Sequence, residues 1–366
     1  MSERWRWRGN VALLAVSLAF VVYPLLPNDD VINSDWPAFA TGARLIVSDP
    51  RHLYDLASQQ RVERAVTGGR VLVTPGIEGI LPFLAPAWVA FVAVPFDLFG
   101  TDIGGRLWVL VGLAALLTAF FLTVRTRREE VLPAFAAVPT ALLMLNAQLD
   151  GLVALGIGAG MALWPRRYLA GLALTLTLMK PQLVLPLGAA VVVAREWKVL
   201  AGWASGGLVL LVATLALNPR WPADWLAQTR ATVAPVSREV DLPHFGVLLP
   251  AAAAPITVAA LAVAAIAAVV YLARRVRGQT MRPALALIVA GGVLAAPHAL
   301  PTDLVLVSLA LVIWAEATWV EWLALSVGAL VAAVAPAPVP AFVGLVLIGG
   351  LAARISLSPS PEPARG

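Results

Sequence analysis

Apolar runs separated by short polar or basic segments follow one another along almost the whole chain. Several of them are well short of the roughly 20 residues that a helix needs to cross a bilayer. Short or proline-broken helices are tolerated where they pack inside a bundle or line a cavity. The pattern predicts an all-helical polytopic membrane protein with a hollow within it. The thirteen runs are 11–26, 81–99, 107–124, 131–146, 151–164, 168–180, 182–194, 199–217, 255–273, 283–297, 303–318, 320–334 and 338–353.

The basic residues between the runs indicate how many runs cross the membrane. If all thirteen crossed in alternation, Arg-rich segments such as 125–130 and 274–282 would face outward, against the excess of Lys and Arg in cytoplasmic loops. The run 81–99 is interrupted by three prolines, so we expect it to be a re-entrant juxtamembrane hairpin in the outer leaflet. A bundle of about twelve transmembrane helices then remains, with both termini cytoplasmic, sixteen of the 26 Lys and Arg inside and ten outside.

This topology predicts one transmembrane domain, residues 1–354, with two sizeable external segments, 27–106 and 218–254. The first run has no convincing small-residue cleavage site, so we expect it to be a retained signal-anchor span. The Pro/Ser-rich tail, 355–366, is typical of a disordered segment. Four separated polar pieces of sequence reach the external face: 30–37, 146–151, 179–182 and 296–303.

Composition narrows the class of protein further. A mean hydropathy of +0.85 and 13% charged residues are far from those of a soluble protein. In a soluble protein the net charge of +5 would suggest nucleic acid, but here the arginines lie between apolar runs and are explained by topology. The absence of cysteine excludes disulfides, thiolate metal sites and a cysteine nucleophile. Three scattered histidines and the lack of a nucleotide-binding glycine loop give no indication of a metal, a cofactor or ATP.

Four stretches of the chain form a recognisable series: "SDWPAFATGARLIVSDPRHLYD" (34–55), "NAQLDGLVALGIGAG" (146–160), "LAGLALTLTLMKPQLVLPL" (169–187) and "APHALPTDLVLVSLALV" (296–312). In this order they resemble glycosyltransferase family 87, whose members include polyprenyl-phosphate-mannose-dependent mannosyltransferases. In the last stretch the chain has Thr302-Asp303 where the family usually has Tyr-Asp. The long first external loop, the hairpin and a second span opened by Arg106 also look like the GT-C architecture.

The resemblance implies that Asp35 is the catalytic base, because such enzymes carry a catalytic Asp in the first external loop. A partly desolvated carboxylate suits this task, since it is ionised at neutral pH and still basic. Asp35 is also well placed to be a structural cap of the helix that Pro37 begins. His298, between two prolines at the same face, is either a second catalytic group that binds the phosphate or acceptor, or a structural side chain.

Lys180 is the most informative charge in the membrane region. Thirteen helical residues after Arg167 rise only about 20 Å, so Lys180 would lie within the outer part of a core about 30 Å thick. We expect it either to bind the donor phosphate, with Asp150 as a possible neutralising partner, or to snorkel to the surface. Arg106 is a second phosphate ligand or a headgroup anchor.

Gln148 and Asp150 are candidate substrate-binding residues in a tight turn, where ordinary turn chemistry also explains them. Tyr54 either shapes the acceptor pocket or belongs to a solvated loop cluster.

These features together predict a plasma-membrane glycosyltransferase that moves a sugar, with mannose favoured, from a polyprenyl-phosphate donor to a glycolipid or cell-envelope glycan, with inversion and on the external face. A transporter or flippase of a lipid-linked sugar is the alternative, since broken helices and buried charge also suit it. An inactive relative that acts as a scaffold is a third possibility. The expected partners are the donor, the acceptor and membrane lipids, and not nucleic acid.

Overall fold

The computed structural model describes residues 33–70, 81–124, 131–240, 254–276, 281–336 and 338–357. Within these ranges the chain is helical and has no strand, which confirms the predicted all-helical class. The predicted first span, 11–26, and most of the predicted tail, 355–366, lie outside the described residues.

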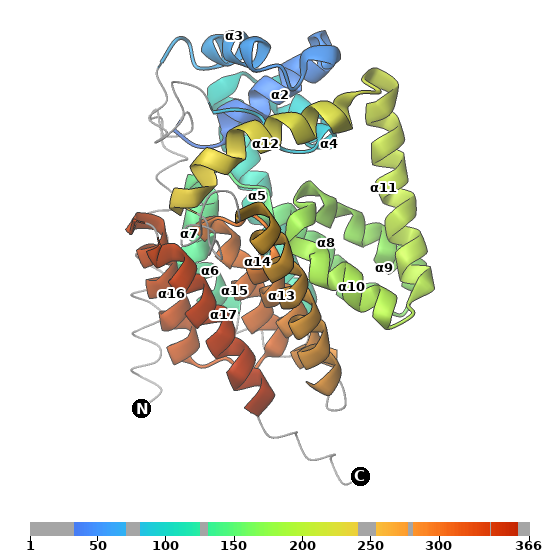
Figure 1. The fold of residues 1–366 in the computed structure, drawn as a ribbon, viewed down its shortest axis with the longest axis vertical. Coiled ribbons are helices and arrows are strands. Elements are labelled where there is room, and N and C mark those ends of the chain that lie inside the picture. Colours follow the sequence, from blue (N-terminus) through green and yellow to red (C-terminus); the bar gives the residue numbers. More distant parts are fainter. Residues whose placement is uncertain are drawn as a thin grey trace.

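A layer of helices from the first predicted external segment lies across one end of a larger helical bundle (Figure 1). The layer consists of α2 (Trp36–Ser48), the short 3₁₀ helix η3 (Pro50–His52), α3 (Leu56–Val66) and α4 (Ala87–Asp97), and α12 (Trp221–Val240), from the second predicted external segment, packs on it. In α12, Trp221, Trp225 and Gln228 recur at helical spacing and face the layer, where the Trp225 indole donates to Leu84 O (2.7 Å). This stripe of three side chains on one face of α12 explains why a polar external segment forms a helix that packs on the layer.

The bundle contains the remaining helices of the described residues. They are α5 (Thr101–Thr123), α6 (Val131–Ala136), α7 (Val138–Leu145), α8 (Asp150–Ala162), α9 (Arg167–Leu174), η5 (Thr175–Met179), η6 (Pro181–Val184), α10 (Leu185–Val193), α11 (Trp197–Leu217), α13 (Ala254–Val276), α14 (Met281–Ala295), η8 (Pro301–Leu304), α15 (Val305–Trp314), α16 (Trp319–Val334) and α17 (Val339–Leu357).

Three helices in the described residues, α5, α11 and α17, are long and apolar enough to cross a membrane. Several apolar helices of the described residues are shorter, with 10–17 residues, and α4 has 11 with Pro95 inside it. Such helices are shorter than the roughly 20 residues that a span needs. The count of twelve spans and the re-entrant position of 81–99 therefore stay predictions.

Several predicted runs are divided in the structure. The run 131–146 forms α6 and α7, because Ala137 is extended and Pro139, which is tolerated in the first turn of α7, has no N–H with which to continue α6. The run 168–180 changes from α9 to the 3₁₀ helix η5, and 303–318 begins within η8. The last two interruptions lie beside the polar cluster described below.

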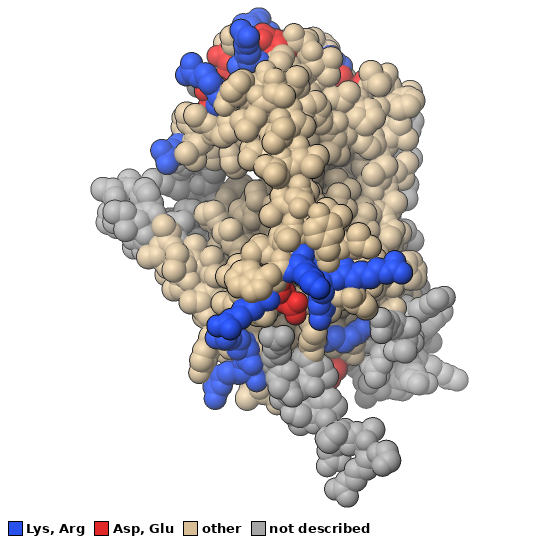
Figure 2. Space-filling view, turned by 90° about the vertical axis from the view of Figure 1, so that its right-hand side faces the viewer, with Lys and Arg blue, Asp and Glu red and all other residues tan. Residues whose placement is uncertain are grey.

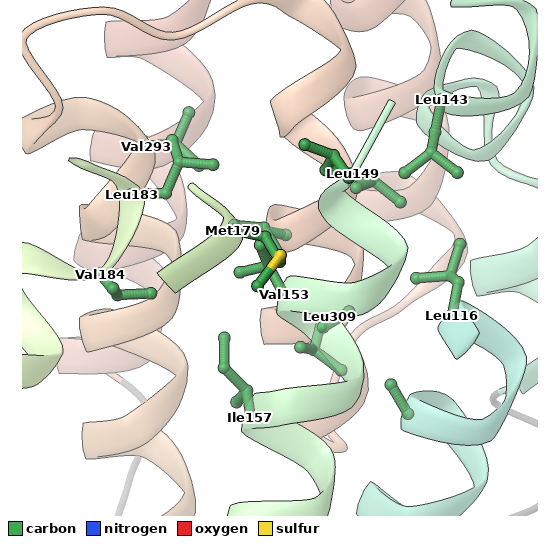
Figure 3. Close-up of a cluster of buried hydrophobic side chains, with 14 of the residues drawn as sticks. Leu116, Leu143, Leu149, Val153, Ile157, Met179, Leu183, Val184, Val293 and Leu309 are labelled. Atoms are coloured by element: carbon green, nitrogen blue, oxygen red, sulfur yellow. The ribbon is translucent and has the colours of Figure 1, made fainter. Parts of the chain in front are cut away.

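The apolar core lies where α5, α7, α8, α14 and α15 meet the interrupted segment η5–η6. Figure 3 shows Val153, Met179 and Leu309, from three of these elements, in one buried cluster. Close approach is required where α8 begins, because a Cβ added to Gly151 would lie 2.1 Å from Gly112 O of α5. Glycine here lets the start of α8 lie directly against α5, and the candidate site is built around that start.

Candidate active site

Asp35 lies immediately before α2, but its side chain does not cap that helix. The Ser34 hydroxyl instead accepts a hydrogen bond from Trp36 N (3.2 Å). The Asp35 carboxylate accepts a hydrogen bond from the amide Nε2 of Gln148, 113 residues further along the chain. The interpretation of Asp35 as a cap therefore does not hold, and its carboxylate is directed to the turn before α8.

That turn, residues 146–148, is held by two other elements. Asp35 N donates to Asn146 O (3.2 Å), and the Trp108 indole of α5 donates to Ala147 O (2.8 Å). Ala147 has the left-handed backbone conformation, with φ of 50°, which turns the chain sharply at the end of α7. The backbone of the turn thus fixes Gln148 beside Asp35.

Lys180 forms the centre of a buried ion cluster. Its Nζ lies 2.8 Å from Asp150 Oδ2 and 2.6 Å from Asp303 Oδ1. The exposed fractions of the three side chains are 12% for Lys180, 0% for Asp150 and 2% for Asp303. Lys180 therefore does not snorkel, and the neutralising partner expected in Asp150 is present together with a second one. We refer to these three residues as the ion triad.

Each member of the ion triad lies at an interruption of helical structure. Asp150 is the first residue of α8, where a negative charge is favoured by the helix dipole. Lys180 separates η5 from η6, and Asp303 lies in η8, where its Oδ2 accepts from Leu300 N (2.7 Å). Irregular backbone at membrane depth is tolerated where it is buried in protein or lines a cavity, and ionisable groups there pair with one another.

The surroundings of Asp35 change its acidity. Burial raises its pKa from 3.8 to about 6; nearby Asp303 also raises it, whereas Lys180, the Gln148 hydrogen bond and His298 lower it. Asp35 keeps partial exposure, in contrast to Asp150 and Asp303. Asp35 is thus the carboxylate of this cluster that a second molecule can reach, and it ionises just below neutral pH.

His298 and Arg106 complete the polar groups at this end. The charge of His298 acts on Asp35, and its side chain is partly exposed. Arg106 lies on α5, two residues before Trp108, and makes no ion pair within the described residues. Its Nε is buried and has no hydrogen-bond partner there. A cation that no carboxylate of the described residues neutralises therefore lies on the helix that holds the 146–148 turn.

Tyr54 lies in a different cluster. Its hydroxyl donates to Ala85 O (2.8 Å), and its ring stacks on Trp221 with centroids 6.3 Å apart. Trp88 meets the same Trp221 edge-on at 5.4 Å. The structure gives Tyr54 a packing role between the layer and α12, and no contact links it to the Asp35 cluster.

Asp303 is the member of the cluster that the sequence does not single out. It was visible only as part of Thr302-Asp303 in the fourth motif, and its position at the start of an apolar run indicates an ionisable residue near the membrane but not its partner. Among the described residues no three His, Cys, Asp or Glu side chains are grouped so as to hold a metal ion. The carboxylates here are partners of a lysine.

Comparison with known proteins places the chain in a family. The model of glycosyltransferase family 87 matches residues 83–301, while no curated protein and no solved structure matches. The matched range includes Arg106, Gln148 and Lys180, whereas Asp35 and Asp303 lie outside it. Because the match covers more than half of the chain and the helices are those of a membrane protein, this protein belongs to glycosyltransferase family 87 and is a membrane glycosyltransferase.

Proposed function

We propose that the protein transfers a sugar, with mannose favoured by the family resemblance, from a polyprenyl-phosphate carrier to a glycolipid or cell-envelope glycan. The observation that carries this proposal is the Asp35 carboxylate. It is partly exposed, takes no part in capping its helix, is oriented by Gln148 and has a pKa near 6. A base with such a pKa is ionised at neutral pH and stronger than an ordinary exposed Asp.

The reaction is an inverting displacement at the anomeric carbon. An acceptor hydroxyl oxygen attacks this carbon from the side opposite to the phosphate, and its proton passes to Asp35. The bond between the anomeric carbon and the phosphate oxygen breaks, and polyprenyl phosphate leaves with the bonding electrons. The Gln148 amide keeps the Asp35 carboxylate in one orientation, which favours proton transfer in the transition state.

We assign the donor phosphate to Arg106, with His298 as a further donor of hydrogen bonds. The sequence predicts Lys180 for this role, but two carboxylates within hydrogen-bond distance already neutralise Lys180. A phosphate approaching the ion triad would meet Asp150 and Asp303 as well. Arg106 has no such carboxylate among the described residues, and a guanidinium matches phosphate geometry with two parallel hydrogen bonds.

We place this end of the bundle outside the cell. The excess of Lys and Arg in the segments that join the helices at the other end supports this orientation. The lipid part of the donor would then lie in the outer leaflet, beside the apolar faces of the bundle.

The test is an assay of labelled polyprenyl-phosphate-mannose with the full-length protein in vesicles, comparing Asp35→Asn with Asp49→Asn. Asp49 is an exposed aspartate that pairs with His52 (2.8 Å) and is the matched control. We expect Asp35→Asn to lower kcat at least about 100-fold, as for loss of a general base, with donor binding retained. Asp49→Asn should keep wild-type activity.

Two results would contradict the proposal. Wild-type transfer by a folded Asp35→Asn variant would remove the proposed base while leaving family membership untouched. Movement of the labelled donor across the vesicle membrane without any glycosylated product would favour the flippase instead.

A further inference from the structure

A cavity of about 250 Å³ lies far along the helices from Asp35, at the end of the bundle where α8, α10 and α13 end and α14 begins. Apolar side chains such as Ile157, Leu187 and Ile288 form most of its wall. The charged members of the wall are Glu196, Arg274 and Arg282. Its volume is slightly below the range of about 300–1,000 Å³ that is usual for small-molecule sites. The cavity is large enough to hold part of an acyl chain.

Cations gather at the same end of the bundle as this cavity. Figure 2 shows Lys and Arg side chains gathered on the lower part of the face that carries α9, α10 and α11. Glu196 is already paired with Arg167 (3.4 Å), and Arg282 donates to Thr123 O (2.7 Å), which closes the end of α5. Arg274 is exposed and has no ion-pair partner in the part of the chain that the structure describes. Its charge is therefore available to a ligand.

Trp164 supplies a second observation that indicates a ligand. Its ring lines the cavity and stacks under Arg167, 4.5 Å from the ring centroid. Its indole Nε1 is buried but donates to no acceptor among the described residues. A buried donor without an acceptor is unfavourable, and an ester or phosphate oxygen at the cavity mouth would satisfy it.

The surface beside the cavity is apolar. Val192 and Val193 of α10 and Val263 of α13 are exposed, as expected for helices in contact with acyl chains. Apolar walls thus occur together with an indole donor and an arginine that have no partner among the described residues, beside an exposed apolar surface. Basic pockets between transmembrane helices on the cytoplasmic side are suited to anionic lipid headgroups.

We propose that this cavity binds one anionic phospholipid of the cytoplasmic leaflet, with an acyl chain between α10 and α13 and the phosphate at Arg274 and the Trp164 indole. This site is separate from the sugar-transfer site, and the bound lipid would hold α13 against α8 and α10. A zwitterionic lipid carries a compensating positive charge and should bind less well.

The test titrates full-length protein in a nonionic detergent with dioleoyl-phosphatidylglycerol, or with dioleoyl-phosphatidylcholine as the counterpart of no net charge. The unfolding midpoint should rise with phosphatidylglycerol, saturate, and exceed the response to phosphatidylcholine. Arg274→Gln should need about fivefold more phosphatidylglycerol to reach half of the rise in the unfolding midpoint, because one basic residue near a lipid surface contributes an effect of this size. Arg275→Gln, which changes the neighbouring exposed arginine outside the cavity wall, is the matched control and should behave as wild type.

A second pair of variants tests the cavity itself. Ala190→Leu fills part of it without changing charge, whereas Ala189→Leu adds the same atoms next to it, outside the wall. Ala190→Leu should abolish the rise and Ala189→Leu should keep it. The proposal is overturned if both lipids stabilise equally, if Arg275→Gln weakens binding as much as Arg274→Gln, or if folded Ala190→Leu responds like wild type.

Discussion

The two ends of the helical bundle differ in whether their charged side chains are buried or exposed. At the end that carries Asp35, a lysine and two aspartates are buried together, and each lies at an interruption of helical structure. At the other end, Arg274 stays exposed at the wall of an apolar cavity, and Lys198 is exposed in the first turn of α11. The difference teaches that the members of the ion triad are buried because the interrupted segments bring them together and they neutralise one another, whereas the cations at the other end stay exposed.

The largest expected effect comes from breaking the ion triad with Lys180→Met. Removing the cation leaves two buried carboxylates without compensation, and breaking a buried ion pair in this way lowers the free energy of unfolding by about 3–5 kcal/mol. Lys198→Met, at the opposite end, removes an exposed cation. It should change the free energy of unfolding by less than about 0.5 kcal/mol. Denaturant titration in mixed micelles, followed by circular dichroism, measures both.

A further variant separates the loss of the cation from the loss of packing. Replacing Asp150 and Asp303 by Asn in the Lys180→Met background removes the two uncompensated charges and should recover part of the stability. Equal stability of Lys180→Met and Lys198→Met would show that the buried cluster does not hold the interrupted segments together.

A smaller effect is expected at Glu63, a carboxylate buried in the layer at the Asp35 end. Its Oε1 accepts from Leu81 N (2.8 Å), its Oε2 has no hydrogen-bond partner among the described residues, and burial raises its pKa to about 7. Because the folded-state pKa lies above the unfolded 4.5, the native state loses stability as the pH rises from 4.5 through 7. The glutamine side chain of Glu63→Gln stays neutral at every pH. The variant should therefore exceed the wild-type free energy of unfolding by on the order of 2 kcal/mol at pH 8, and should differ little from it at pH 4.

Glu316 provides the comparison for Glu63, since it is exposed and lies at the opposite end, after α15. Glu316→Gln should change the free energy of unfolding by less than about 0.5 kcal/mol at either pH. A Glu63→Gln variant with the same stability as wild type at pH 8 would mean that the carboxylate is not desolvated.

Sequence patterns predicted the parts of this protein that depend on local chemistry. Long apolar runs gave the helices, and a lysine placed too deep in an apolar run indicated the buried cluster, with Asp150 as its partner. Asp303 was not singled out because its contact with Lys180 spans 123 residues, and no local pattern encodes such a pair. The helix α12 was expected only as an external segment, since its Trp221 stripe has meaning only against the layer it covers.

The assignment of Asp35 shows the same limit. Its sequence context suits a helix cap, and only the fold shows that Ser34 accepts the hydrogen bond there while Gln148 binds the Asp35 carboxylate. The single-domain boundary at residue 354 and the twelve spans depend on a membrane that encloses the bundle, and they stay predictions. Cysteine labelling from either side of the membrane would test them in this cysteine-free chain.

The smallest expected effect is a shift in the pH dependence of the reaction when the hydrogen-bond partner of Asp35 is replaced. A base with a pKa of about 6 gives a transfer rate that falls as the pH drops through 6, because protonated Asp35 cannot accept the proton of the acceptor hydroxyl. The Gln148 hydrogen bond lowers this pKa, so Gln148→Leu should raise the pH of half-maximal kcat by about half a unit to one unit. Gln60→Leu in α3 is the matched control and should leave the profile unchanged, since Gln60 has no contact with Asp35. A Gln148→Leu profile that moves to lower pH, or not at all, would mean that Gln148 does not stabilise the ionised base.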